Sequence, residues 1–469
     1  MPTSWKTLHV PPGFTALLEQ ALAAGEGTVI KESPARRVLS LDLALEGRTW
    51  PLVVKEYRCP TRTDRLRWRL SATGAHREWH NLLRLWGREG VPPVPRPLAL
   101  GTRSAAEEPS PGPGPGSGPV TVLVLERLPG VEPASAILEK EWAGWPCSVR
   151  RAWQQRLAHW LNLLHQSGVE HRDLHPGNIL VDRQDERLYL IDLADARVRR
   201  RPLSPREKQR NLVILNRYFS QRLTRTARLR FLACLLQEDP HWEEPLPDLA
   251  RRLEQDTWRS CLAFWEKRDR RLRRQGKYFG HRREKRYRVF WHRPLPAELE
   301  SPREAPAHLF PPPGPVIKDG RASTLYGWSP GLLVKRYNLK HVRNLVGDLI
   351  TGTRVRRGWA MSHRLLHRGL PTPLLHLAVE KRCGPFPCGG AVAMEEVAPA
   401  GTLDRWVAAG PAPAERRRLA TRLARLLRRF HDLGFAHGDL KSSNLLVREG
   451  EPFLLDTDVI RAYRALPYP

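Results

Sequence analysis

The residues best suited to chemistry gather around Asp173, where a carboxylate and an amide stand five positions apart. Phosphoryl transfer needs a carboxylate to orient the attacking hydroxyl, ligands for a metal ion, and a cation on the nucleotide phosphates. Asp173 suits the first task, and Asn178 and Asp192 suit the second. Lys55, at the end of a predicted strand, suits the third, and Glu78 on the next helix is placed to hold that lysine. The sequence therefore predicts an ATP- and Mg²⁺-dependent phosphotransferase site in which each required role is filled.

The chain repeats this set of features in the same order further along. The second set comprises Lys335, Asp439, Asn444 and Asp456, with Lys441 two residues after Asp439. Asp439 is the second candidate catalytic carboxylate, the two lysines are candidates for nucleotide contacts, and Asn444 and Asp456 are candidate metal ligands. The spacing between the copies is far too long for a solenoid repeat, so it predicts two domains in tandem.

The second copy departs from the first in two places. Gly358 stands where the first copy has Glu78, so the sequence predicts that Lys335 lacks its carboxylate partner. Only thirteen residues follow Asp456, so the second domain is predicted to be shortened after its metal-binding aspartate. These differences favour a nucleotide-binding accessory domain over a second independent enzyme. A composite site that borrows helices from the first domain is the alternative.

The elements that must position these residues are strands first and helices second in each copy. Short β-branched runs predict the strands, and apolar residues at helical spacing predict the helices. A strand lobe followed by a helical lobe is an α+β arrangement. The predicted elements of the first copy are strands at 29–38, 53–57 and 120–125 and a helix at 149–167, and the second copy has a similar helix at 414–433 that ends at Gly434.

A Pro-rich, polar stretch predicts the boundary between the two domains. We expect a first domain at 1–297, a linker at 298–315 and a second domain at 316–469. A Pro/Gly run from Pro109 to Pro119 separates two strand-like segments of the first copy, so it predicts a loop insertion.

The motifs of the first copy also resemble a known family. The segment from His171 to Asn178, His-Arg-Asp-Leu-His-Pro-Gly-Asn, looks like the catalytic loop of the protein-kinase-like superfamily. Over residues 25–235 the chain is similar to the lipopolysaccharide core kinase family, the Kdo and heptose kinases. The motifs that carry this likeness are Lys55-x-Tyr57, Arg77-Glu-Trp79, Gly90-Val-Pro-Pro-Val-Pro95 and His171 to Asn178.

The resemblance implies two bilobal kinase-like domains and transfer of phosphate from ATP to a sugar of the lipopolysaccharide core or another lipid-linked glycan. It also implies work at the cytoplasmic face of the inner membrane, with possible peripheral contact to that surface. Neither copy has a G-x-G-x-x-G phosphate loop, and the matching turns fall at 32–37 and 319–323.

Three other classes of protein stay open. A serine/threonine protein kinase ranks second, because the short segment 193–204 has no Ala-Pro-Glu anchor and His175 replaces the lysine usual in such kinases. A catalytically inactive tandem pseudokinase scaffold ranks third. A nucleic-acid-binding protein ranks last, so nucleic acid is not an expected partner.

The net charge of +29 suits an anionic partner, although arginine is frequent throughout the chain. Between Lys267 and Arg288 there are twelve Lys or Arg residues and two acids. This run is open to three interpretations: contact with anionic headgroups or phosphorylated sugar, contact with nucleic acid, or a solvated basic helix and linker.

The composition also predicts the compartment. The six cysteines are scattered, which is not a disulfide framework and favours reducing surroundings. Cys383 and Cys388 form a C-x₄-C pair without the second pair that a zinc site requires. The N-terminus lacks an apolar signal core and no stretch has the length of a membrane span, so we expect a cytoplasmic protein.

Overall fold

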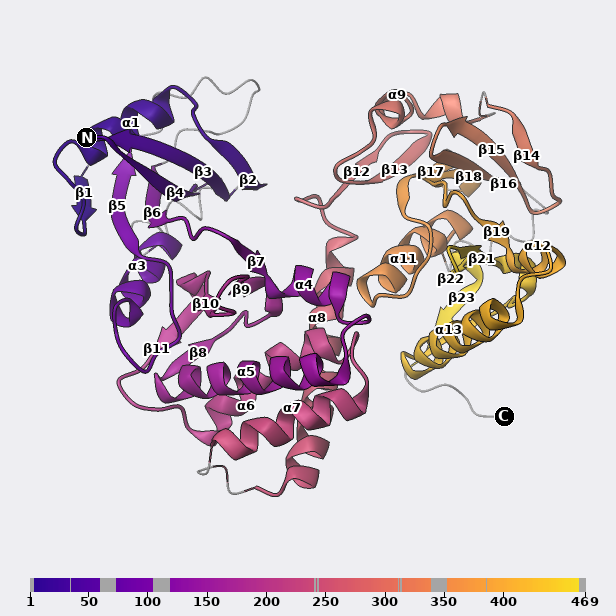
Figure 1. Cartoon of the computed structure of the whole chain (residues 1–469). Coiled ribbons are helices and arrows are strands. Elements are labelled where there is room, and N and C mark those ends of the chain that lie inside the picture. Colours follow the sequence, from indigo (N-terminus) through magenta and orange to yellow (C-terminus); the bar gives the residue numbers. More distant parts are fainter. Residues whose placement is uncertain are drawn as a thin grey trace. The chain divides into compact units, whose positions relative to one another are not determined.

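The computed structural model divides the chain into two compact units, Met1–Cys261 and Leu262–Pro469. Each unit is mixed α/β, with a strand-rich and a more helical region (Figure 1). The boundary falls inside the long helix α8 (Leu246–Arg271). The residues that the structure describes are 4–33, 35–59, 73–103, 119–239, 242, 244–310, 312, 314–338, 352–384 and 386–463.

The first unit contains a six-stranded antiparallel sheet in the order β1-β5-β6-β4-β3-β2. Alternate residues of a strand point to opposite faces, so one strand serves two cores. Val122 and Val124 of β6 pack towards α1 (Phe14–Ala23), whereas Leu123 packs towards α3 (Gly74–Leu85). The strands are β1 (Ser4–Thr7), β2 (Thr28–Ser33), β3 (Arg36–Leu45), β4 (Arg48–Tyr57), β5 (Pro97–Arg103) and β6 (Val120–Glu126).

This alternation decides where Lys55 lies. Lys55 of β4 is the register partner of Leu123 of β6, so both side chains leave the sheet on the face that α3 covers. Helix α3 starts at a cap in which the hydroxyl of Thr73 accepts from the backbone N–H of His76 at 3.3 Å. The sheet and the capped helix thus bring the lysine and α3 to one face.

The remainder of the first unit is mainly helical and surrounds the largest core cluster of that unit. Helix α6 begins with Pro205 and a capping box in which Glu207 accepts from the backbone N–H of Ser204. The elements are β7 (Val131–Pro133), α4 (Ala134–Glu141), α5 (Cys147–Gln166), β8 (Val169–His171), η2 (Pro176–Asn178), β9 (Ile179–Asp182), β10 (Leu188–Leu190), η3 (Leu193–Asp195), β11 (Ala196–Val198), α6 (Pro205–Phe219), α7 (Arg225–Glu238) and the start of α8.

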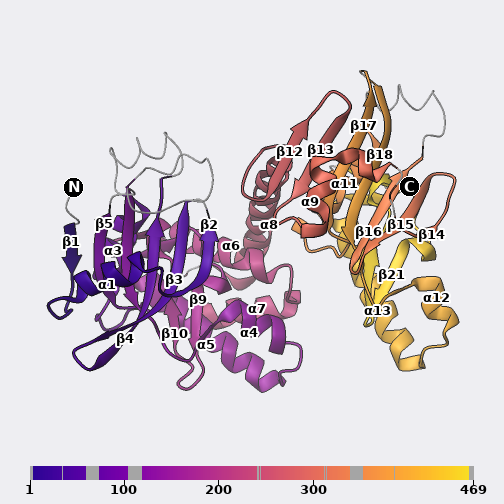
Figure 2. The same cartoon turned by 90° about the horizontal axis from the view of Figure 1, so that it is seen from above.

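The second unit contains a seven-stranded antiparallel sheet in the order β12-β13-β17-β18-β16-β15-β14, with α11 (Arg354–His367) packed on β17 and β18 (Figure 2). Lys335 of β16 is the register partner of Val392, which belongs to the core on the α11 face. The strands are β12 (Phe279–Arg283), β13 (Tyr287–His292), β14 (Val316–Lys318), β15 (Ser323–Ser329), β16 (Leu332–Tyr337), β17 (Leu375–Cys383) and β18 (Phe386–Glu395).

The second half of this unit repeats the small sheets of the first unit. The sheet β19-β21-β22 corresponds to β7-β9-β10, and the pair β20-β23 corresponds to β8-β11. Helix α13 ends at Asp432, and Gly434 beyond it has a φ of +78°, which confirms the predicted helix end. The elements are β19 (Gly401–Thr402), α12 (Leu403–Ala408), α13 (Pro413–Asp432), β20 (Phe435–His437), η6 (Ser442–Asn444), β21 (Leu445–Arg448), β22 (Glu451–Leu454), η7 (Thr457–Val459) and β23 (Ile460–Ala462).

The second unit begins earlier than the sequence predicts. The basic run expected at the end of the first domain forms the hairpin β12-β13, and β13 pairs with β17 of the second sheet. The expected linker forms η4 (Ala297–Leu299), α9 (Glu300–Glu304) and η5 (Pro306–Leu309). Leu299 and Leu309 are fully buried in the core of the second unit. These two leucines therefore anchor the stretch to the core of the second unit.

Two other expectations concern loops. The strand expected at 29–38 is two strands, because β2 ends at Ser33 and β3 begins at Arg36. This hairpin lies where the sequence predicts the turn that replaces a glycine-rich phosphate loop. Residues 109–118 of the expected loop insertion lie outside the described residues.

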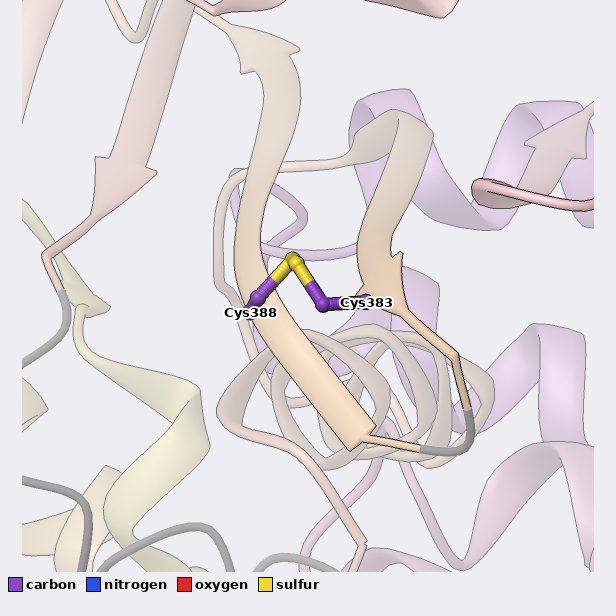
Figure 3. Close-up of a disulfide and its surroundings, with 2 residues drawn as sticks. All are labelled: Cys383 and Cys388. Atoms are coloured by element: carbon purple, nitrogen blue, oxygen red, sulfur yellow. A yellow bond between two sulfur atoms is a disulfide. The ribbon is translucent and has the colours of Figure 1, made fainter.

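The hairpin β17-β18 carries a disulfide between Cys383 and Cys388, whose Cα atoms are 5.8 Å apart (Figure 3). The sequence predicted scattered cysteines without a disulfide framework, in reducing surroundings, and the bridge of this one pair was not expected. The two cysteines are five positions apart, and the hairpin folds them onto facing strands. Cys147 and Cys234 are free thiols.

No helix of the described part of the chain is both long enough and apolar enough to cross a membrane.

Candidate active site

In the first unit, His171 links the loop that carries Asp173 to the strand that precedes Asp192. It lies at the end of β8 and is fully buried. Its Nδ1 accepts from the backbone N–H of Asp173 at 3.2 Å, and its Nε2 lies 3.3 Å from the carbonyl oxygen of Ile191. Burial lowers the pKa of His171, which favours the neutral ring that such a donor–acceptor pair requires.

Asp173 and Asn178 are joined directly. The side-chain amide of Asn178 donates to the carbonyl oxygen of Asp173 at 2.9 Å, and its backbone carbonyl accepts from Ile191 at 3.1 Å. Asn178 is 7% exposed, whereas the side chain of Asp173 is 64% exposed. The Nε2 atom of His175 lies 3.7 Å from the Asp173 carboxylate. The carboxylate is therefore open to an incoming hydroxyl, while the amide beneath it is fixed.

Lys55 and Glu78 form a buried ion pair between β4 and α3. The Nζ atom of Lys55 lies 2.7 Å from Oε1 of Glu78, and the Tyr57 hydroxyl donates to Oε2 at 2.6 Å. Burial alone would lower the pKa of Lys55, but the charges of Glu78 and Asp192 outweigh it and the pKa is raised. The lysine is thus held as a cation in fixed geometry.

Asp192 lies on the other side of this lysine. It has a left-handed backbone conformation, with a φ of 64° and a ψ of 51°, where the chain turns from β10 into η3. Its carboxylate accepts two hydrogen bonds from Arg36, at 2.7 and 3.1 Å, and lies 3.4 Å from Nζ of Lys55. Burial would raise the pKa of Asp192, but Lys55 and Arg36 overcome that effect and lower it.

Helix α3 also holds the backbone that follows Asp192. The Asn81 amide donates to the carbonyl oxygens of Leu193 and Ala196, both at 2.9 Å, and Arg77 Nε donates to the Ala194 carbonyl at 3.0 Å. The helix that bears Glu78 and the segment that bears Asp192 are therefore one hydrogen-bonded frame.

The second unit repeats the same connections. The His437 ring lies 3.0 Å from the carbonyl oxygen of Leu455 and accepts from the backbone N–H of Asp439 at 3.2 Å. The Asn444 amide donates to the carbonyl oxygen of Asp439 at 2.8 Å and to its carboxylate at 3.1 Å. Lys441 also binds that carboxylate, at 2.7 Å. The candidate catalytic carboxylate therefore has two partners within its own loop.

The lysine of the second unit contacts its aspartate directly. The Nζ atom of Lys335 lies 2.5 Å from Oδ1 of Asp456, which has a left-handed backbone conformation like that of Asp192. Burial would raise the pKa of Asp456, but Lys335 lowers it. In both units the structure brings together the residues that the sequence selected.

The family model described as the lipopolysaccharide kinase (Kdo/WaaP) family matches residues 21–234 and 332–463. These stretches cover more than half of the chain and contain both sets of site residues. The chain belongs to the lipopolysaccharide kinase (Kdo/WaaP) family. The predicted resemblance is confirmed.

Two further comparisons complete these findings. The solved structure "WaaP in complex with acyl carrier protein" is 23% identical in sequence. The alignment covers 55% of this chain and 98% of that one, with a TM-score of 0.38. No curated protein matches the chain.

In the first unit of this Kdo/WaaP family member, the side-chain oxygen atoms of Asp192 and Asn178 are suitable ligands for a magnesium ion. Mg²⁺ takes one or two carboxylates from a protein and completes its shell with phosphates and water. Asp192 is an anion under two cations, and no described residue donates to Oδ1 of Asn178. Among the residues that the structure covers, no three His, Cys, Asp or Glu side chains form a cluster able to hold a metal alone. Such a cluster is not needed where phosphates supply ligands.

Four side chains around the two Kdo/WaaP sites were assigned no role from the sequence, although Tyr57 belongs to the Lys55-x-Tyr57 motif. Arg36 and Tyr57 contact the site of the first unit, and Arg354 and Asp458 contact that of the second. Tyr57 and Tyr337 could have been found, because each follows its lysine by two positions and so lies on the same face of the strand. Arg36 becomes apparent only from the register of β3, in which it lies opposite Tyr57.

A cavity of about 550 Å³ lies among the helices of the first unit. It is lined mainly by apolar side chains from α5, α6, α7 and α8, among them Trp153, Leu157 and Phe219. None of the predicted site residues lines it. The candidate phosphotransfer residues of this Kdo/WaaP family member therefore lie at the polar cluster and not at this apolar cavity.

Proposed function

We propose that the first unit is a kinase domain that transfers the γ-phosphate of ATP to a hydroxyl of a lipopolysaccharide-core sugar or another lipid-linked sugar. Membership of the lipopolysaccharide kinase family supports the reaction class. The observation that carries the proposal is the connected set Glu78–Lys55–Asp192, with distances of 2.7 and 3.4 Å. Lysine, helix carboxylate and aspartate are the parts that phosphoryl transfer needs around the nucleotide.

The residue roles follow from position. Lys55, held by Glu78 and Tyr57, contacts the nucleotide phosphates. The exposed carboxylate of Asp173 orients the acceptor hydroxyl and accepts its proton. The acceptor oxygen bonds to the γ-phosphorus as the bond to the β–γ bridging oxygen breaks, and ADP leaves.

Asn178 and Asp192 are the residues that would hold Mg²⁺. When bound, the ion neutralises charge on the phosphate oxygens. Arg36 donates one hydrogen bond to each carboxylate oxygen of Asp192 in this structure, and each oxygen keeps a lone pair with which it could bind the ion.

The wider arrangement is part of the same proposal. The chain is a tandem of two bilobal kinase-like domains, each with a strand-rich lobe and a helical lobe. The first domain catalyses transfer, and the second is an accessory domain in which Lys335 and Lys441 contact nucleotide and Asn444 and Asp456 are the candidate metal ligands. The protein works where ATP is present, on the cytoplasmic side of the membrane that bears the acceptor, and contacts that surface peripherally.

Transfer of labelled γ-phosphate in the presence of Mg²⁺ tests the proposal. Lipopolysaccharide core, a generic protein substrate and no acceptor are compared for the wild type, Asp192→Ala and Asp456→Ala. Label on the glycan that is lost with Asp192→Ala but persists with Asp456→Ala supports a sugar kinase in the first unit. Label on the protein substrate alone would establish a protein kinase instead, and no transfer from a folded wild type would point to an inactive scaffold.

A further inference from the structure

The second unit leaves little room for a side chain at the position that matches Glu78. That position is Gly358 of α11, where a Cβ atom would lie 3.3 Å from the Tyr337 hydroxyl and 3.4 Å from the Cβ of Asp458. The Thr457 hydroxyl also donates to the carbonyl oxygen of Gly358, at 3.1 Å. The residues after Asp456 therefore pack closely against the bare backbone of the helix.

Asp458 supplies a carboxylate in that space. It is 4% exposed, and its Oδ1 lies 3.9 Å from Nζ of Lys335. Its Oδ2 accepts from Nε of Arg354 at 2.7 Å. Its Oδ1 accepts no hydrogen bond from any residue in the described part of the chain. This oxygen is therefore available to interact with Lys335. Lys335 therefore has two acidic neighbours, as Lys55 has in the first unit.

The corresponding positions of the first unit are occupied in the opposite way. Ala194, two residues after Asp192, stands where the second unit has Asp458. Gly74, four residues before Glu78, stands where the second unit has Arg354. One unit thus pairs a helix glutamate with a small residue after the aspartate. The other pairs a helix glycine with an acid after the aspartate.

The arginine at the site also comes from a different element in each unit. In the first unit, Arg36 of β3 binds Asp192, and its guanidinium carbon lies 5.9 Å from the centre of the Tyr57 ring. In the second unit, the residue in register with the matching tyrosine is Ser323. There Arg354 of α11 approaches the tyrosine instead, with its guanidinium carbon 4.8 Å from the centre of the Tyr337 ring.

Buried charges are costly unless they are paired, so a site that merely decays tends to lose them. Here Asp458, Arg354 and Lys335 form one network beside Gly358. The cations Lys335 and Lys441 suit a polyphosphate, and Asp456 and Asn444 keep the arrangement that their counterparts have in the first unit.

We propose that the second unit has its own binding site for a nucleoside triphosphate, in which Asp458, held by Arg354, replaces the helix glutamate as the buried carboxylate that positions Lys335. The class of ligand rests on the proposed function of the first unit. The relocation of the carboxylate rests on the geometry above.

Equilibrium binding of the nonhydrolysable ATP analogue AMP-PNP, with Mg²⁺ and the full-length chain, tests the proposal. Two molecules are expected to bind per wild-type chain and one per Lys55→Met chain, because that change removes only the first site. In the Lys55→Met background, Asp458→Ala should weaken the remaining site at least tenfold. Asp404→Asn, which changes an exposed acid on α12 of the same unit, is the matched control and should leave affinity unchanged.

A swap of the carboxylate makes the test independent of simple loss of stability. Gly358→Glu alone should abolish binding, because it places a second acid against Asp458. The double variant Gly358→Glu with Asp458→Ala recreates the pattern of the first unit and should regain binding to within a few-fold of Lys55→Met. Circular dichroism and thermal melting show whether each variant is folded.

The outcomes separate this inference from the proposed function. One bound nucleotide per wild-type chain, lost entirely with Lys55→Met, would overturn the second site. Binding that depends on Lys335 but is insensitive to Asp458→Ala would overturn the relocated carboxylate. Where Asp458→Ala fails to fold, absence of binding in the folded double variant would do the same. Absence of transfer by the first unit, with Lys335-dependent binding retained, would overturn the proposed function and leave this inference standing.

Discussion

Both units place a lysine beside an aspartate, but the neighbouring charges come from different elements. In the first unit a glutamate from the helix approaches Lys55, and an arginine from the neighbouring strand holds the aspartate. In the second unit the additional acid comes from the segment after the aspartate, and the arginine comes from the helix. The difference teaches that the electrostatic requirement is preserved while the element that meets it changes.

The corresponding helices α5 and α13 of the two units differ in how many of their residues are buried. Helix α5 of the first unit buries eight residues, including Trp153 and Trp160, against neighbouring elements. Helix α13 of the second unit buries only Leu419, Leu426 and Phe430. Much of its remaining surface is arginine, including Arg417 and four others. An arginine surface is stable in water, so the described part of the second unit does not need the helical cover that α6 and α7 give the first.

The largest effect should separate the two candidate metal-binding aspartates. We expect Asp192→Ala to lower kcat for phosphate transfer by about 10³-fold or more, because it removes both a metal ligand and the partner of Lys55. Asp456→Ala should lower it by no more than a few-fold. Steady-state transfer to lipopolysaccharide core measures both values. Equal losses from the two substitutions would contradict a division of labour and favour a composite site.

The next effect concerns the helix glutamate. Glu78→Gln keeps the shape but removes the charge that raises the pKa of Lys55, and we expect a loss of about 10- to 100-fold in kcat/KM. An Ala194→Asp substitution added to Glu78→Gln gives the first unit an acid at the position where the second unit has Asp458. Partial recovery of activity in that double variant would sharpen the comparison, and a further loss would show that the first unit cannot use an acid at this position.

Acid sensitivity should depend on buried histidines in both units. Burial lowers the pKa of His165 in the first unit to about 3, with Lys208 adding to the effect, and lowers that of His363 in the second. The unfolded chain takes up a proton near pH 6.5, where the folded protein does not, so stability is present above that pH and is lost as pH falls. Each histidine contributes a slope of about 1.4 kcal/mol per pH unit below that point.

Urea unfolding at pH 7 and pH 5 measures this slope for wild type and His165→Leu. No described residue bonds to either ring nitrogen of His165, so leucine should be tolerated at pH 7 and should flatten the loss at pH 5. His363→Leu is the counterpart in the second unit, where His292, His367 and His376 lie in the same cluster and their mutual repulsion adds to burial. An unchanged slope in both variants would mean that other groups control acid unfolding.

The smallest effect concerns the paired tyrosines. Tyr57→Phe removes the hydrogen bond to Glu78 but leaves the ion pair, so we expect a loss of about three- to tenfold in kcat/KM, in line with about 1 kcal/mol for one hydrogen bond. Tyr337→Phe should change transfer less, because the Tyr337 hydroxyl belongs to the accessory site. A larger effect of Tyr337→Phe than of Tyr57→Phe would reverse the assignment of the active unit.

The sequence alone was sufficient for features that depend on neighbours along the chain. The two loops that carry the candidate catalytic aspartates, the asparagines that follow them, the repeat itself, the family and the end of α13 at Gly434 all follow from local spacing. Five positions between Asp173 and Asn178 already bring an amide to a carbonyl, because the intervening turn is short. Alternation along β4 likewise placed Lys55 on one face of a sheet.

Only the tertiary structure decided what depends on strand register and on the meeting of distant segments. Arg36 reaches Asp192 across 156 positions, and Asp458 replaces a glutamate that the sequence showed only as missing. The start of the second unit and the Cys383–Cys388 bridge depend on which strands pair, and pairing is chosen by the whole core at once. A residue's type limits the charge it can carry, but the fold decides which partner comes within about 4 Å of that charge.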